Sequence, residues 1–173
     1  MPALRTRRHS VEWAFRHWEI IRSTMPRFDS GMIRIEEAAL CYESKTYGSW
    51  QLALADVRII GEFTSQDGPF RDDYFVCFAR DADRWWEASF YADGWDQVLR
   101  GLNQHLDAQM ELRLAGSVDF ASRIIWPTYL VDQPMFDFSN PSPEGLTQRA
   151  KEFLLPTKRQ TLSTVALKEL SSR

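Results

Sequence analysis

The three histidines, His9, His17 and His105, are scattered in the sequence and belong to no recognisable catalytic or metal-binding motif. The chain contains no Gly-x-Ser-x-Gly nucleophile elbow, no P-loop and no Gly-x-Gly-x-x-Gly fingerprint, the short motifs that position a nucleophile or a phosphate group. His105 lies beside an apolar stripe, where a hydrogen-bonded histidine at the boundary of a core is commoner than a general base. We therefore predict no catalytic residue and no cofactor, and we expect a protein that is not an enzyme.

Acidic side chains that lie close together could act as paired carboxylates or hold a hard cation. They occur at three places: Glu36 with Glu37, Asp72 with Asp73, and Asp81 with Asp83. Adjacent residues of a strand point to opposite faces, so the first two pairs are poor candidates for paired-carboxylate chemistry. The third pair lacks the further oxygen ligands that calcium needs, and we interpret it as a solvated turn. No metal site is predicted.

The composition is typical of a globular protein rather than of a nucleic-acid binder. Of the 173 residues, 44% are hydrophobic and 26% are charged, and the formal net charge is −3. Nucleic-acid-binding domains usually carry a basic face, so no nucleic-acid partner is expected. The two cysteines, Cys41 and Cys77, form no zinc or redox motif and are expected to be buried thiols in a reducing compartment. Because no stretch is apolar and long enough to cross a bilayer, we expect a soluble cytoplasmic protein.

Short stretches with the alternation or the continuous hydrophobicity of β-strands lie between residues 32 and 91, separated by turn residues. The predicted strands span residues 32–35, 38–43, 49–54, 57–63, 73–80 and 84–91. The fifth of them is apolar on both faces, as in a central strand that is covered on both sides. Gly61 is a candidate β-bulge. Runs this short, linked by turns, predict an antiparallel β-meander that curls into a partly open barrel.

An amphipathic helix is predicted to close this meander. Asp93 is the expected N-cap, because a carboxylate there can accept a hydrogen bond from a backbone N–H of the first turn. Apolar residues then recur at helical spacing: Trp95, Val98, Leu99, Leu102, Leu106 and Met110. A helix of this length is marginal alone in water, so its apolar stripe is expected to dock on the sheet. The predicted fold class is therefore α+β.

Residues 28–110 are predicted to form one domain, with an extension on either side. Residues 1–27 carry six arginines and two acidic residues, and a basic amphipathic helix is expected there. Residues 111–173 are expected to form short strands and helices that pack on the domain or on a partner. The predicted elements of this second extension are a strand at 111–115, a brief helix at 117–125, extended stretches at 128–131 and 135–138, and helices from Ser142 and over 161–170.

Five apolar side chains are candidate interface residues: Trp13, Trp18, Ile20, Trp85 and Trp86. The first three belong to the basic N-terminal helix, in which Trp13 and Ile20 form a second apolar ridge. That helix is expected to pack on its own domain or on a second copy, with an anionic membrane surface or an acidic partner as the alternative. The other two lie on opposite faces of one predicted strand. One of them is expected in the core and the other in a groove or an interface, because Trp is enriched at binding hot spots.

Within residues 32–107, three segments of predicted strands precede the segment of the closing helix. They are IRIEEAALCY (33–42), LALADVRII (52–60), DDYFVCF (72–78) after a Gly-Pro turn, and GWDQVLRGLNQHL (94–106). In this order of strands and one closing helix, the segment resembles a bacterial pleckstrin-homology-like (PH-like) domain. The resemblance covers less than half of the chain and implies a binding or assembly scaffold. The early strand loop offers only Lys45 where phosphoinositide-binding members carry a basic cluster, so no phosphoinositide site is expected.

These observations together predict a non-enzymatic binding or assembly module that acts through protein–protein contact or self-association. Two alternatives stay open. The small size and the acidic balance also fit an inhibitor of the immunity-protein type, and the basic N-terminal helix also fits a module that docks on a membrane surface. A carrier of a small apolar ligand would need a cavity inside the barrel.

Overall fold

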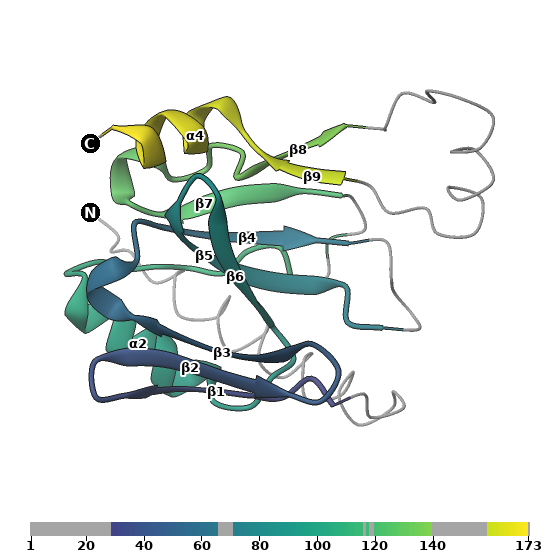
Figure 1. Ribbon diagram of the computed structural model, residues 1–173, viewed down its shortest axis with the longest axis vertical. Coiled ribbons are helices and arrows are strands. Elements are labelled where there is room, and N and C mark those ends of the chain that lie inside the picture. Colours follow the sequence, from purple (N-terminus) through teal and green to yellow (C-terminus); the bar gives the residue numbers. More distant parts are fainter. Residues whose placement is uncertain (1–28, 66–70, 116, 118–119, 140–158, 173) are drawn as a thin grey trace, which may run out of the picture.

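The computed structural model describes residues 29–65, 71–115, 117, 120–139 and 159–172. The predicted N-terminal helix and the helix expected from Ser142 lie outside these residues. So do three of the candidate interface residues, Trp13, Trp18 and Ile20. The described elements form an α+β fold of mostly antiparallel sheets with two α-helices (Figure 1).

The first sheet holds three antiparallel strands in the order β1-β2-β3. Their bounds are Met32–Glu36 for β1, Ala39–Ser44 for β2 and Gly48–Ala53 for β3. Alternation along the strands decides the two faces of this sheet. Ile33, Leu40 and Tyr42 point into the core, whereas Arg34 and Glu43 lie on the outer face and form an ion pair there. A short 3-10 helix, η1 (Leu54–Asp56), follows β3.

The second sheet is antiparallel and has the strand order β6-β5-β4-β7. Its strands are β4 (Ile59–Thr64), β5 (Tyr74–Asp81), β6 (Arg84–Ser89) and β7 (Ser122–Trp126). β5 lies inside the sheet, and its first six residues are all buried, which confirms a strand covered on both faces. The irregular pairing predicted at Gly61 is also confirmed, because the register between β4 and β7 shifts there. All six strands predicted between residues 32 and 91 are present, with ends that differ by one or two residues.

A third layer covers the face of the second sheet that points away from the first sheet. It consists of β8 (Phe136–Ser139), which pairs antiparallel with β9 (Arg159–Leu162), and of helix α4 (Thr164–Ser171). The helix predicted over 161–170 begins later than expected, because residues 159–162 pair as a strand and Ser163 is the N-cap. The Ser163 hydroxyl accepts a hydrogen bond from the Ala166 N–H at 3.1 Å. At the other end of α4, the Arg58 guanidinium donates to the carbonyls of Glu169 and Leu170 at 2.7 and 3.0 Å.

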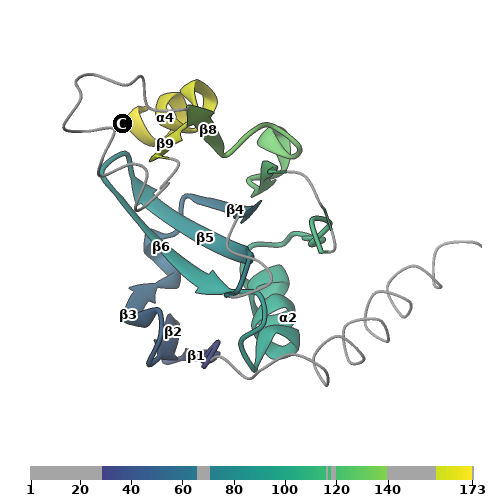
Figure 2. The same ribbon diagram turned by 90° about the vertical axis from the view of Figure 1, so that its right-hand side faces the viewer.

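The second sheet lies between the first sheet with α2 on one side and the third layer on the other (Figure 2). It separates two apolar clusters. The first cluster lies between this sheet, the first sheet and helix α2, and it contains Phe78 and Trp95. The second cluster lies between this sheet and the third layer, and it contains Phe63 and Phe136. Both cysteines are buried free thiols, as predicted, and Cys77 belongs to the second cluster. Burial raises the pKa of the Cys77 thiol well above its usual range, which disfavours the reactive thiolate form.

Helix α2 (Trp95–His105) closes the first cluster with the predicted apolar face, from which Trp95, Val98 and Leu102 are buried. The predicted N-cap at Asp93 is wrong. Gly94 occupies the cap position with φ +104°, and no side chain caps the first turn. The Asp93 carbonyl instead accepts from the Ile33 N–H of β1, and the Asp93 N–H donates to the Gly31 carbonyl. These two bonds hold the chain against the Ile33 carbonyl. A Cβ on Gly94 would collide with that carbonyl oxygen, so only glycine fits.

The sequence predicts a meander that curls into a partly open barrel; the meander forms no closed barrel, and its strands lie in two separate sheets. Aromatic side chains bond to the outer edge of β6 where a further strand would otherwise pair. The indole N–H groups of Trp50 and Trp95 donate to the carbonyls of Glu87 and Ser89, both at 2.8 Å. The Ser89 N–H lies 3.4 Å from the Tyr42 hydroxyl. Because these groups satisfy the edge of β6, the architecture is that of a partly open β-sandwich.

Several predictions beyond α2 are wrong. The helix ends at His105 rather than Met110, although Met110 is buried. Residues 111–115 form no strand, since two of their backbone N–H groups bond to a buried carboxylate. The predicted helix at 117–125 is replaced by β7, and residues 128–130 form a 3-10 helix, η2 (Thr128–Leu130), rather than an extended stretch. The extended stretch at 135–138 is confirmed as β8. Among the described residues, no helix is long and apolar enough to cross a membrane.

Candidate functional site

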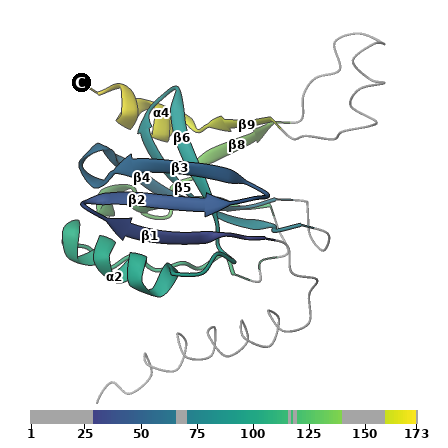
Figure 3. The same ribbon diagram turned by 60° about the horizontal axis from the view of Figure 1, so that its bottom comes forward.

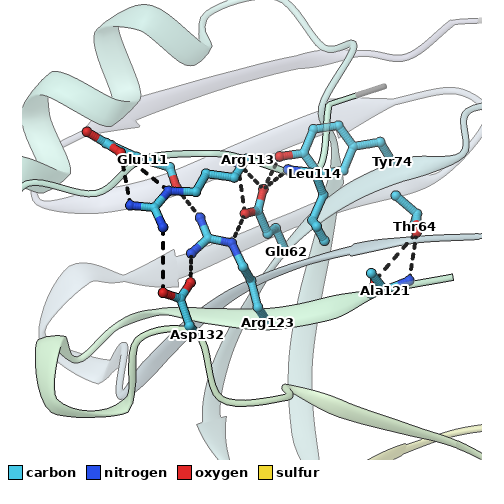
Figure 4. A network of polar contacts seen from close by, with 9 residues as sticks. All are labelled: Glu62, Thr64, Tyr74, Glu111, Arg113, Leu114, Ala121, Arg123 and Asp132. Atoms are coloured by element: carbon cyan, nitrogen blue, oxygen red, sulfur yellow. Dashed lines mark hydrogen bonds and ion pairs between the residues drawn. The ribbon is translucent and has the colours of Figure 1, made fainter. Parts of the chain in front are cut away.

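Glu62 on β4 is fully buried, which makes its carboxylate the first place to look for chemistry. The Arg123 Nε on β7 donates to it at 2.5 Å, and the two form an ion pair inside the fold. The backbone N–H groups of Arg113 and Leu114 and the hydroxyl of Tyr74 also donate to it (Figure 4). Burial raises the pKa of Tyr74 well above its usual range, and the adjacent carboxylate adds to the rise.

A chain of charges continues outward from this buried pair. The second arm of the Arg123 guanidinium donates to the Asp132 carboxylate at 2.6 Å, and its third nitrogen donates to the Glu111 carbonyl. The Arg113 guanidinium lies 3.5 Å from Asp132 and 3.1 Å from the Glu111 carboxylate. Each buried group in this network has its partners, so no lone pair of Glu62 is left to bind a substrate or a metal. We interpret the network as a structural link between β4, β7 and residues 111–114.

Asp72 forms a second buried polar cluster at the start of β5. Its carboxylate accepts hydrogen bonds from the Ser89 hydroxyl at 2.5 Å and from the Ser30 hydroxyl at 3.2 Å. Its backbone N–H donates to the Tyr47 hydroxyl, and burial raises the pKa of Tyr47 to about 12. A serine beside a carboxylate suggests nucleophilic chemistry, but Ser89 is completely buried, and no imidazole adjoins it among the residues that the structure describes. This cluster therefore holds the chain between β5, β6 and the residues before β1.

Trp85 and Trp86, the candidate interface residues on β6, each face a different one of the two apolar clusters. Trp85 is half-buried against Phe136 of the second cluster, and its indole N–H donates to the Glu87 carboxylate at 2.9 Å. Trp86 is half-buried on the opposite face, where the Arg80 guanidinium carbon lies 5.8 Å from its ring centroid. The opposite orientation is confirmed, and each side chain keeps some exposed surface. Burial raises the pKa of Glu87, and the hydrogen bond from the Trp85 indole N–H offsets part of this rise.

A surface groove of about 610 Å³ lies between α2 and the turn that joins β1 to β2. We call it the β1–α2 groove, and Figure 3 shows α2 running beside β1. Its lining residues are Arg34, Ile35, Ala38, Leu54, Gln97, Gly101, Gln104 and His105. Gly101 lets the helix approach the strand closely, because a Cβ there would lie 2.7 Å from the Ile35 side chain. The groove thus has an apolar floor with amide and imidazole groups along the helical wall.

The surroundings of the β1–α2 groove are acidic. The exposed acidic residues Glu36, Glu37 and Asp56 lie within two positions of its lining residues in the sequence, and the exposed Arg100 is the basic neighbour of Gly101. Arg34 is the arginine among the lining residues, and it is already paired with Glu36 and Glu43 at 2.6 Å each. The hydrogen bonds that the Arg34 guanidinium donates to Glu43 and Glu36 raise its pKa. The groove therefore offers more negative than positive charge to a ligand.

The comparisons with known proteins identify no relative. No family model matches the chain, and no curated protein and no solved structure is similar enough to match it.

The other sequence-predicted candidates for chemistry do not converge. His105 lines the β1–α2 groove and is exposed, while Asp81 ends β5 and Asp83 lies in the turn that follows. No group of three or more His, Cys, Asp or Glu residues that could hold a metal is found in the described part of the chain. Sequence reasoning missed Glu62, although a charged residue inside the otherwise apolar segment 59–63 was the signal that could have found it.

Proposed function

We propose that the protein is a non-enzymatic binding or assembly module of PH-like type, which acts through protein–protein contact or self-association. The observation that carries this proposal is the β1–α2 groove. It combines an apolar floor with adaptable polar groups on the wall, and it lies on the surface rather than inside the fold. The succession of six strands and a closing helix supports the PH-like part of the proposal.

The two buried polar clusters support a role in binding rather than in catalysis. In both of them, the carboxylate is enclosed and its acceptor positions are taken by donors of the same chain. A catalytic carboxylate or serine must reach its substrate, which neither Glu62 nor Ser89 can do at 0% exposure. We extend the proposal to a cytoplasmic protein, since two free thiols fit a reducing compartment.

The assembly part is tested by light-scattering mass at high protein concentration, on the full chain and on a chain that lacks residues 1–27. An oligomeric full chain and a monomeric, folded shortened chain would support self-association through the basic segment. If both are monomers, self-association is wrong and contact with a different protein is the function that remains. Sedimentation with anionic vesicles at low salt would instead support the membrane alternative.

A further inference from the structure

We propose that the β1–α2 groove binds an extended peptide with alternating apolar and basic side chains, which adds as a strand to the outer edge of β1. The inference rests on the proposed function and names the kind of partner that this site accepts. It is independent of whether the protein also self-associates.

The first step is the direction of the backbone groups along β1. The Ile33 N–H donates to the Asp93 carbonyl at 2.8 Å, so the polar groups of Ile33 point away from β2. Polar groups of alternate strand residues point the same way, and those of Ile35 therefore also face outward. In the part of the chain that the structure describes, Asp93 pairs with β1 near Met32, and no strand continues that pairing as far as Ile35.

The second step is the space beside this edge. Ile35 lines the β1–α2 groove, and the opposite wall is the face of α2 that carries Gln97, Gly101 and Gln104. These residues are spaced by four and three positions, so they lie on one side of the helix. Gly101 contributes no side chain at the middle of this wall. Carboxamides on either side of it can donate to and accept from a peptide backbone in any register.

The third step is the choice of side chains. Residues of an added strand alternate between the floor of the groove and the solvent. The floor is apolar, with Ile35 and Leu54, and Leu54 is itself buried. The turn between β1 and β2 and the 3-10 helix η1, which supply Ala38 and Leu54, also carry the exposed acidic residues Glu37 and Asp56, and Glu36 is paired with Arg34. A peptide that places small apolar side chains inward and lysines outward matches both surfaces, whereas an acidic peptide is repelled.

The probe is the synthetic peptide acetyl-Val-Lys-Val-Lys-Val-amide, titrated into the full, isotope-labelled chain and followed by amide chemical shifts. We expect saturable shifts at Ile35, Gly101 and Gln104, together with slower hydrogen exchange of the Ile35 N–H in the complex. The same peptide with glutamate in place of lysine should bind at least about tenfold more weakly. A version with every backbone nitrogen methylated should not bind, because it cannot donate to the edge of β1.

A charge-matched pair of variants locates the site. Gln97→Lys with Gln104→Lys adds two positive charges to the groove wall and should weaken the lysine peptide about tenfold. Ser49→Lys with Gln51→Lys makes the same change in net charge on exposed positions of β3, and it should leave binding within about twofold. Absence of saturable shifts at Ile35, equal binding of the methylated peptide, or an equal loss in both variants would overturn the inference. If the chain self-associates but does not bind the peptide, the proposed function stands and the peptide-binding inference is wrong.

Discussion

At the scale of single residues, the Glu62–Arg123 ion pair is the most deeply buried pair of charges among the described residues. Two charges that leave water cost free energy, and the geometry compensates only because each group also has further partners. Glu62 accepts from the backbone of Arg113 and Leu114, and Arg123 also bonds to Asp132. The pair should therefore tolerate joint replacement better than the loss of one member.

We expect Arg123→Met to lower the free energy of unfolding by about 3–5 kcal/mol, because it leaves a buried carboxylate without its cation. The double variant Glu62→Gln with Arg123→Met should lose less than the sum of the two single changes. Urea unfolding of the four proteins measures this coupling. Additive losses would show that the two side chains do not act as a buried pair.

The half-buried Glu87 should lower the free energy of unfolding as the pH rises, which is the opposite of what an ion-paired carboxyl group does. Burial raises its pKa in the folded state, so the folded protein binds this proton more readily than the unfolded chain does. The resulting penalty is absent below the unfolded-state pKa and grows as the pH rises through the folded-state pKa. Glu87→Gln should therefore raise the melting temperature at pH 7, and the gain should vanish near pH 4.

Glu43 is the control for this prediction. Hydrogen bonding to Arg34 lowers the pKa of Glu43, so its contribution is present at neutral pH and is lost as the pH falls. Glu43→Gln should shift the melting temperature at pH 7 downward or not at all. If Glu87→Gln lowers the melting temperature at pH 7, the assigned burial of that carboxylate is wrong.

At the scale of elements, the strands and the apolar face of α2 could be predicted because both depend on local alternation and periodicity. The start of α2 could not, since the sequence offers Asp93 as a standard cap and only the contact with β1 disqualifies it. The same holds for residues 111–115. Their alternation suggests a strand, but their N–H groups bond to Glu62, about fifty residues earlier in the chain.

A comparison of alanine variants at Gly94 and Gly48 distinguishes the cost of backbone strain from the cost of a steric collision. Both have a positive φ, +104° and +85°, but a Cβ would collide with the Ile33 carbonyl at Gly94 and meet nothing within 4 Å at Gly48. Gly48→Ala should cost about 1–2 kcal/mol from the backbone conformation alone. Gly94→Ala should cost at least about twice as much, because the helix must also move off β1. Equal losses in thermal unfolding would mean that the contact between Gly94 and β1 is not tight.

At the scale of the whole molecule, the outer layers are not accessory to the first six strands. β7 completes the second sheet on β4, and the third layer buries Phe63 and Phe75. Sequence patterns reveal neither relation, because both join segments that are far apart in the chain. The β1–α2 groove was also not predicted, although His105, one of its lining residues, was singled out. It arises where a helix and a strand edge diverge, which only the assembled fold decides.

A chain of residues 28–110 alone should therefore fail to fold cooperatively. It would lack β7, the donors to Glu62 from residues 113, 114 and 123, and the cover of the second cluster. The loss should appear as an absent near-ultraviolet circular dichroism signal and a broad denaturant transition. The control is a chain of residues 28–173, which keeps every described element and should unfold cooperatively. A sharp transition for residues 28–110 would show that the C-terminal layers are dispensable.

The central functional claim is that the outer edge of β1 is open beside α2 and available to a partner. Hydrogen exchange of the backbone amides in the free, monomeric protein tests it most directly. The Ile33 N–H, which bonds to the Asp93 carbonyl, should exchange slowly. The Ile35 N–H on the same edge should exchange much faster, by about two orders of magnitude or more. Equal protection of the two amides in the monomer would contradict the account, because the edge would then already be occupied.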